Sequence, residues 1–103
     1  MDKIAALKEI LALDAANSFA RYGLAMEFAA KGETDAALQQ FETLLGNDPE
    51  YTAGYFMAAQ TLSNAGRNVE AIGKLKAGID CAKRAGNQHA LSEMQAMLDV
   101  LDR

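Results

Sequence analysis

The stretch GETDAALQQFETLLGNDP, residues 32–49, is followed by a degraded copy, GRNVEAIGKLKAGIDCAK, residues 66–83. The two stretches start 34 residues apart, and Phe41 of the first copy aligns with Leu75 of the second. The other aligned pairs of apolar positions are also small or apolar in both copies. Within each copy these positions follow the three- and four-residue spacing of one helix face. A fixed period of this size predicts stacked pairs of antiparallel helices.

Apolar spacing and the residues between the apolar runs predict six helices. Gly32 and Gly66 stand where a left-handed residue can end the first helix of a pair. Asp48, Pro49 and Glu50 together are typical of a helix start: an N-cap, a first-turn proline and an acid facing the helix dipole. The predicted helices lie at about residues 3–13, 18–31, 34–46, 50–65, 68–85 and 88–102. The first is in phase with the third and is expected to be half of a truncated repeat, and the last closes the stack.

Composition favours one small helical domain and excludes several functions. The chain has 103 residues, half of them hydrophobic, with one Pro and no Trp. Its formal charge of −4 argues against general binding of nucleic acid, which needs clustered Lys and Arg. No apolar run approaches the roughly 20 residues of a membrane span. A single Cys allows no internal disulfide, so we expect a soluble cytoplasmic protein with a reduced thiol.

The chain resembles the tetratricopeptide repeat (TPR) family. The family's first-helix pattern of Trp, Leu, Gly and Tyr falls on Arg21, Leu24, Ala25 and Phe28, and then on Tyr55, Ala58, Ala59 and Leu62. The Ala and Phe of its second helix fall on Ala37 and Phe41, and then on Ala71 and Leu75. Two departures are clear: Arg21 replaces the bulky aromatic, and Lys83 replaces the closing proline that the first copy has at Pro49.

The resemblance covers nearly the whole chain, with two full repeats at about residues 18–51 and 52–85. It implies an all-α solenoid of antiparallel helix-turn-helix units in a single domain, residues 1–103, with half-repeat helices at both ends. The N-terminal half-repeat is the helix at 3–13, and the C-terminal capping helix is that at 88–102. Such a scaffold binds another polypeptide and carries no catalytic chemistry.

The resemblance also indicates a binding surface, because the first helix of each hairpin lines the concave side in this family. The residues expected there are Phe19, Tyr22, Met26 and Ala30, and then Ala53, Phe56, Met57, Gln60 and Asn64. Aromatic rings and Met suit an apolar peptide or helix. The alternative is that these side chains fill a tight, short superhelix. Only Gln60 and Asn64 offer donors and both are uncharged, so the carboxylate clamp of some chaperone-binding relatives is not expected.

Residues for chemistry are few. His89 is the only imidazole and Cys81 the only thiol, and Gly86 is expected to break the helix between them. A nucleophile pair needs contact and an orienting group, and a tetrahedral metal site needs four ligands. No glycine-rich phosphate loop is present. We therefore expect no catalytic residue, no metal and no cofactor.

The predicted first helix carries a second apolar side. Ala6, Ile10 and Leu13 lie away from its core stripe, whereas the end of a solenoid normally turns a polar face to water. Either the helix after Ser18 covers Ile10 and Leu13, or they form an edge for another protein or a second copy. The alternative function is therefore an assembly module that forms a homodimer through this helix.

Overall fold

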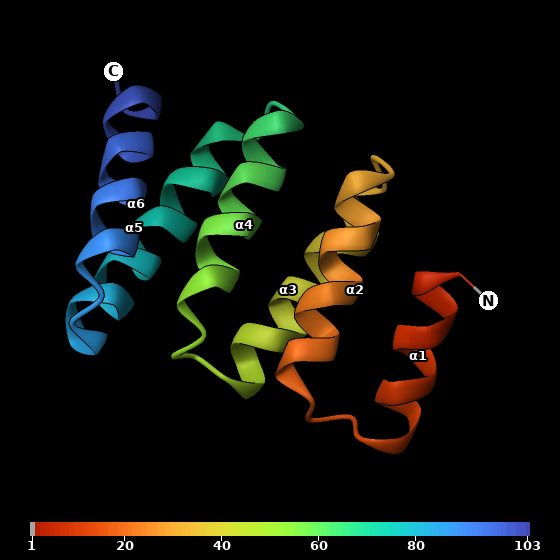
Figure 1. Ribbon diagram of the computed structural model, residues 1–103. Helices are drawn as coiled ribbons and strands as arrows, with labels where there is room; N and C mark the ends of the chain where they lie inside the picture. Colours follow the sequence, from red (N-terminus) through yellow and green to blue (C-terminus); the bar gives the residue numbers. More distant parts are fainter. Residues whose placement is uncertain (1) are drawn as a thin grey trace.

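The computed structural model describes residues 2–103, and within this range it contains helices and no strand. The helices follow one another along a gently curved stack, with α1 at one end and α6 at the other (Figure 1). Their bounds are α1 (Lys3–Leu13), α2 (Ser18–Ala30), α3 (Thr34–Asn47), α4 (Thr52–Asn64), α5 (Asn68–Ala85) and α6 (Gln88–Leu101). The prediction of an all-α solenoid of helix-turn-helix units is confirmed.

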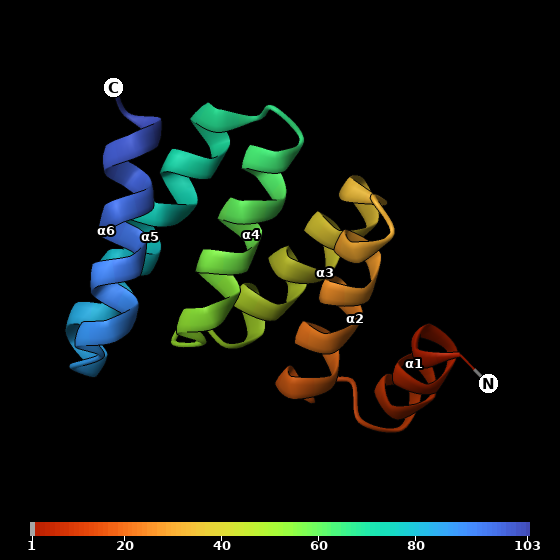
Figure 2. The same ribbon diagram turned by 45° about the horizontal axis from the view of Figure 1, so that its top comes forward.

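The helices form two complete hairpins between two incomplete ones. Helix α2 packs along α3, and α4 packs along α5; α3 then contacts α4, and α5 contacts α6. Helices α2, α4 and α6 lie next to one another in one layer, with α3 and α5 behind them (Figures 1 and 2). Helix α1 packs on α2 in the way that α3 packs on α4. Helix α1 is therefore a second helix without its first, and α6 is a first helix without its second.

Glycines close the two hairpins as the sequence predicts. Gly32 has φ of 75° and Gly66 has φ of 78°, a left-handed conformation that a side chain would strain. The following residues, Glu33 and Arg67, donate their backbone N–H groups to Phe28 and Leu62 over 3.0 and 2.9 Å. This bond across the end of a helix satisfies a carbonyl that would otherwise lack a partner.

The predicted helix start at Asp48, Pro49 and Glu50 is wrong. Helix α3 runs through Asn47, and Asp48 is its C-cap, with its backbone N–H donated to Leu44 over 2.8 Å. Tyr51 then donates its N–H to the Asp48 carbonyl over 3.1 Å, so the three residues form a turn and α4 begins at Thr52. Asp and Pro favour turns as well as helix starts, so these three residues are compatible with either. The other helix ends differ from the prediction by no more than one residue.

The core consists of two clusters of buried residues. The first core cluster is Ala25, Ala37, Phe41, Leu44 and Ala58; the second is Ala59, Leu62, Ala71, Leu75, Ile79, Ala82 and Met94. Phe41 and Leu75, which the repeat aligns, are both fully buried. Leu38 packs against both clusters and so joins them.

One glycine inside a helix marks the closest approach between elements. Gly78 lies in the middle of α5 and is buried between α4 and α6. A Cβ at this position would lie 2.6 Å from the Cβ of Tyr55 and 2.5 Å from Sδ of Met94, closer than van der Waals contact allows. A glycine inside a helix is ordinarily destabilising, whereas this fold uses the missing side chain of Gly78 to bring three helices together.

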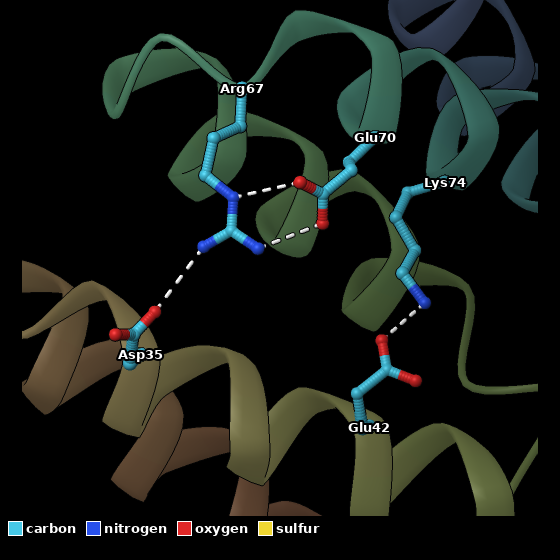
Figure 3. A network of polar contacts seen from close by, with 5 residues as sticks. All are labelled: Asp35, Glu42, Arg67, Glu70 and Lys74. Atoms are coloured by element: carbon cyan, nitrogen blue, oxygen red, sulfur yellow. Dashed lines mark hydrogen bonds and ion pairs between the residues drawn. The ribbon is translucent and has the colours of Figure 1, made fainter.

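Ion pairs connect the second helices of the two hairpins across the surface (Figure 3). Arg67 lies 3.3 Å from Asp35 of α3 and bonds both oxygens of Glu70 over 2.9 and 2.8 Å, which holds the pKa of Glu70 below its usual range. Seven residues, or two helical turns, further along, Lys74 of α5 meets Glu42 of α3. Exposed pairs of this kind contribute little to stability individually, but they show that charges on neighbouring second helices are matched.

Cys81 is a packed core residue. Its side chain is fully buried on α5, and Sγ lies 3.1 Å from Oγ1 of Thr52 on α4. We expect Cys81→Ser to lower the free energy of unfolding by about 1 kcal/mol, the scale of one altered buried polar contact, and to leave binding intact. Chemical denaturation and slow labelling of the native thiol would check this. Loss of a measurable activity with the fold preserved would contradict it.

Candidate functional site: the α2–α4 surface

The predicted binding residues lie on the adjacent first helices α2 and α4. We call these residues the α2–α4 surface: Phe19, Tyr22 and Met26 of α2, with Phe56, Met57, Gln60 and Asn64 of α4. The helices are held side by side by direct contact and by α3, which packs against both. The hairpin geometry thus fixes the surface without any loop contributing to its spacing.

Tyr22, Met26 and Met57 share one core cluster as their support. All three are half-buried and pack against the first core cluster, two from α2 and one from α4. The Tyr22 ring meets the Phe41 ring edge-on, with centroids 6.5 Å apart and planes at 68°. One side of Tyr22 is therefore core and the other remains open, which combines the two interpretations that the sequence left open.

Tyr51 is a neighbour that the sequence analysis missed. Its ring centroid lies 5.3 Å from that of Tyr22, with the planes tilted by 41°. Burial, and then the nearby Tyr51, raise the pKa of Tyr22; burial, and then Asp48, raise the pKa of Tyr51. Both phenols therefore stay neutral near pH 7. Tyr51 directly precedes the first residue of α4. The predicted start at residue 50 placed Tyr51 inside the helix and so concealed its position in the turn.

The remaining predicted residues spread away from this centre. Phe56 is half-buried against the second core cluster. Gln60, four residues later on α4, is also half-buried. Phe19 is 79% exposed at the start of α2, and Asn64 is exposed at the end of α4. Ala30 and Ala53 are exposed as well. The surface thus has an apolar, half-buried centre and more exposed residues at its ends.

Arg21, which stands where the family has an aromatic residue, forms bonds within the chain. Its guanidinium donates to Oε1 of Gln40 over 2.8 Å and to the backbone carbonyl of Ala15 over 2.9 Å. These bonds tie α2 to α3 and to the turn after α1. The departure from the family pattern replaces packing by hydrogen bonds and does not add a positive charge to the α2–α4 surface.

The apolar edge of α1 is open. Ile10 is 43% exposed, Leu13 is 93% exposed and Ala6 is half-buried. The interpretation that the helix after Ser18 covers Ile10 and Leu13 is therefore wrong. Helix α2 packs instead on the side that carries Leu7, whose methyl groups reach to within 3.4 Å of a Cβ built at Gly23.

The only imidazole and the only thiol lie apart in different surroundings. His89 is exposed on α6 with Nε2 3.1 Å from Oε1 of Glu93, and Cys81 is buried against Thr52. Over residues 2–103, no three His, Cys, Asp or Glu side chains gather in a way that would hold a metal ion. In the same range, no helix has both the length and the apolar character needed to cross a membrane.

Stacked helical hairpins with a 34-residue period define a helical repeat solenoid. No family model matches the sequence, but similar proteins identify the repeat. A solved tetratricopeptide repeat domain protein from Salinibacter ruber is 32% identical, with 82% of this chain and 86% of that chain covered and a TM-score of 0.78. A TPR repeat-containing protein of Pseudomonas aeruginosa is 28% identical over 97% of this chain and 95% of its own length. The chain belongs to the tetratricopeptide repeat family.

A further solved structure is similar over most of the chain. YrrB, a TPR protein with an unusual peptide-binding site, is 25% identical, with a TM-score of 0.74. The match covers 86% of this chain but 45% of YrrB. The shared part is therefore less than half of the YrrB chain.

Proposed function

We propose that this protein is a non-catalytic scaffold that binds an apolar peptide or helix of another polypeptide on the α2–α4 surface. The observation that carries the proposal is the half-buried centre formed by Tyr22, Met26 and Met57 across two adjacent helices. Rigid rings supply contact area at low entropic cost, and Met side chains adapt to a partner's shape. Family membership and the peptide-binding site of YrrB support the same reading.

The chemistry of the surface indicates the kind of ligand. Its predicted members carry no formal charge, and their two amides, Gln60 and Asn64, both lie on α4. The neutral phenols of Tyr22 and Tyr51 add hydrogen-bonding groups beside the centre. A ligand helix or strand with large apolar side chains and a few polar backbone or amide groups fits this arrangement. A ligand held mainly by a terminal carboxylate does not.

The test is a peptide selection followed by methyl spectroscopy. A displayed peptide library is selected against the protein, and the bound peptide is titrated into protein labelled at Met methyl groups. We expect the Met26 and Met57 signals to shift and the signal of Met94, which is fully buried, to stay in place. Tyr22→Ala or Phe56→Ala should then weaken binding by more than about 1–2 kcal/mol, as aromatic anchors do.

Thermal unfolding of the same variants separates binding from packing. Tyr22→Ala and Phe56→Ala should lower stability less than Leu62→Ala, whose side chain is only 1% exposed. Equal, large destabilisation by all three would assign the aromatics to the core. A selected peptide that leaves the Met26 and Met57 signals unmoved would place binding elsewhere.

A second candidate function, assembly through α1, is favoured by the exposure of Ile10 and Leu13. An apolar solenoid end is unusual because terminal repeats normally keep their outer face polar. A mass that rises with protein concentration would support assembly. A constant monomer mass would leave the peptide scaffold as the function.

A further inference from the structure

Within residues 2–103, the helices at the two ends of the stack are complementary halves of one hairpin. Helix α1 is a second helix that lacks its first, and α6 is a first helix that lacks its second. We propose that a second copy docks its α1 on α6, so that the junction completes a hairpin and copies stack head to tail. This contact is heterologous, because different surfaces meet, and it differs from a closed dimer in which one α1 faces another.

The open face of α6 is the face that the next helix covers elsewhere in the stack. When α6 and α4 are matched from their first residues, Leu91 stands for Tyr55, Ser92 for Phe56 and Gln95 for Ala59. On α4 these residues pack towards α5 and its cluster. On α6 the same face lines an open depression of about 430 Å³, bordered by Lys83 of α5. The depression therefore lies where the second helix of a third hairpin would lie.

The open face of α1 is likewise the face that a preceding helix would cover. One repeat further on, Ile10 corresponds to Leu44. Leu44 is 1% exposed between α2 and α4, whereas Ile10 is 43% exposed. The difference arises because, within residues 2–103, α1 packs on α2 alone and no helix covers its other face. Leu13, one turn away and 93% exposed, extends the same apolar edge.

Charges at the two ends are complementary. Lys83 of α5 borders the depression, and Lys76 lies seven residues before it on the same helix; both are exposed. At the other end, Asp2, the N-cap of α1, and Glu9 of α1 are also exposed and seven residues apart, in the row of Ala6 and Leu13. No ion pair within residues 2–103 includes any of these four charges.

The interior of the protein shows the same matching between neighbouring second helices. There, Asp35 and Glu42 of α3 are seven residues apart and pair with Arg67, the N-cap of α5, and with Lys74 of α5, which are also seven apart (Figure 3). A docked α1 would continue this row beyond α5, with acids facing lysines.

The junction is expected to be weak and reversible. Gln95 stands where Ala59 lets α4 and α5 approach closely, so α1 would lie further from α6 than α5 lies from α4. Ser92 and Asp99 add polar groups to the same face. A contact between two short helices also falls below the roughly 1,200 Å² of a stable interface. Association should therefore depend on concentration and salt.

Sedimentation of the full chain tests the proposal with one variant blocked at each end. Leu13→Glu places a charge on the α1 edge, and Ala96→Glu places one in the depression; both positions are exposed, so folding should be preserved. The unaltered protein should gain mass with concentration beyond a dimer. Each variant alone should stay monomeric, and an equal mixture should form 1:1 dimers and stop, because one intact α1 meets one intact α6.

Other outcomes overturn the proposal. Dimers formed by Ala96→Glu alone would mean that α1 pairs with α1, and an unaltered protein that stays monomeric at millimolar concentration would mean that the ends do not associate.

Charge exchange supplies a second test: Glu9→Lys and Lys83→Glu should each weaken association severalfold, and the double variant should restore it. If the double variant has native helix content by circular dichroism but does not regain association, Glu9 and Lys83 do not face each other across the junction. Tyr22→Ala should leave association unchanged, which keeps this test separate from that of peptide binding.

Discussion

Phe41→Ala is expected to lower the free energy of unfolding by about 3–5 kcal/mol, the usual cost of removing a buried Phe side chain. Phe41 is fully buried in the first core cluster, and its ring meets that of Tyr22 edge-on. The same cluster contains Ala25 of α2 and Ala58 of α4, so Phe41 packs against both helices. The total stability of a domain of this kind is roughly 5–15 kcal/mol. The variant should therefore be marginally folded at 25 °C, and urea denaturation would measure the loss.

Phe19→Ala is the matched control for this change. The same atoms are removed from a side chain that is 79% exposed, so stability should change by less than about 0.5 kcal/mol. A Phe41→Ala protein as stable as the Phe19→Ala protein would show that Phe41 does not pack between the repeats. The assignment of the first core cluster would then be wrong.

Gly78→Ala is expected to lower the free energy of unfolding by about 1–3 kcal/mol, the usual cost of overpacking a core. The added methyl group would lie 2.6 Å from Cβ of Tyr55, which is close to the backbone of α4 and cannot move without the helix. It would also lie 2.5 Å from Sδ of Met94. This clash outweighs the gain of up to about 1 kcal/mol that Ala brings over Gly inside a helix.

Gly73→Ala, on the same helix, isolates that gain. No atom lies within 4 Å of a Cβ built at Gly73, and the residue is exposed. Stability should therefore rise by about 0.5–1 kcal/mol. The two substitutions are chemically identical and should have opposite signs in the same denaturation experiment. A rise for both would mean that α5 and its neighbours are less closely packed at Gly78 than the structure shows.

The sequence predicted the fold well because a repeat averages over local errors. Six helices, the left-handed glycines and the burial of Phe41 and Leu75 all follow from one period and one apolar stripe. Where a signal was local and ambiguous, prediction failed. Asp48, Pro49 and Glu50 are compatible with both a turn and a helix start, and only the bonds made by α3 decide between them.

The binding surface was predicted less completely, because it depends on contacts between segments. Helical spacing placed Tyr22 and Phe56 on their helices, but it could not show that Tyr51 stacks on Tyr22 from outside any helix. Helical spacing could not show the ion pair between Asp35 and Arg67 either, because the two residues belong to different repeats. Neither relation has a periodic signature in one sequence.

The absence of any buried residue from α1 has a consequence for motion. Local opening of a segment costs about as much free energy as the contacts that it gives up, and α1 gives up contacts with α2 alone. The two core clusters of the remaining helices are connected by Leu38, which packs against both. The N-terminal helix should therefore open and close while the rest stays folded, and its amide hydrogens should exchange with solvent first. Any molecule that covers its apolar edge would slow that exchange.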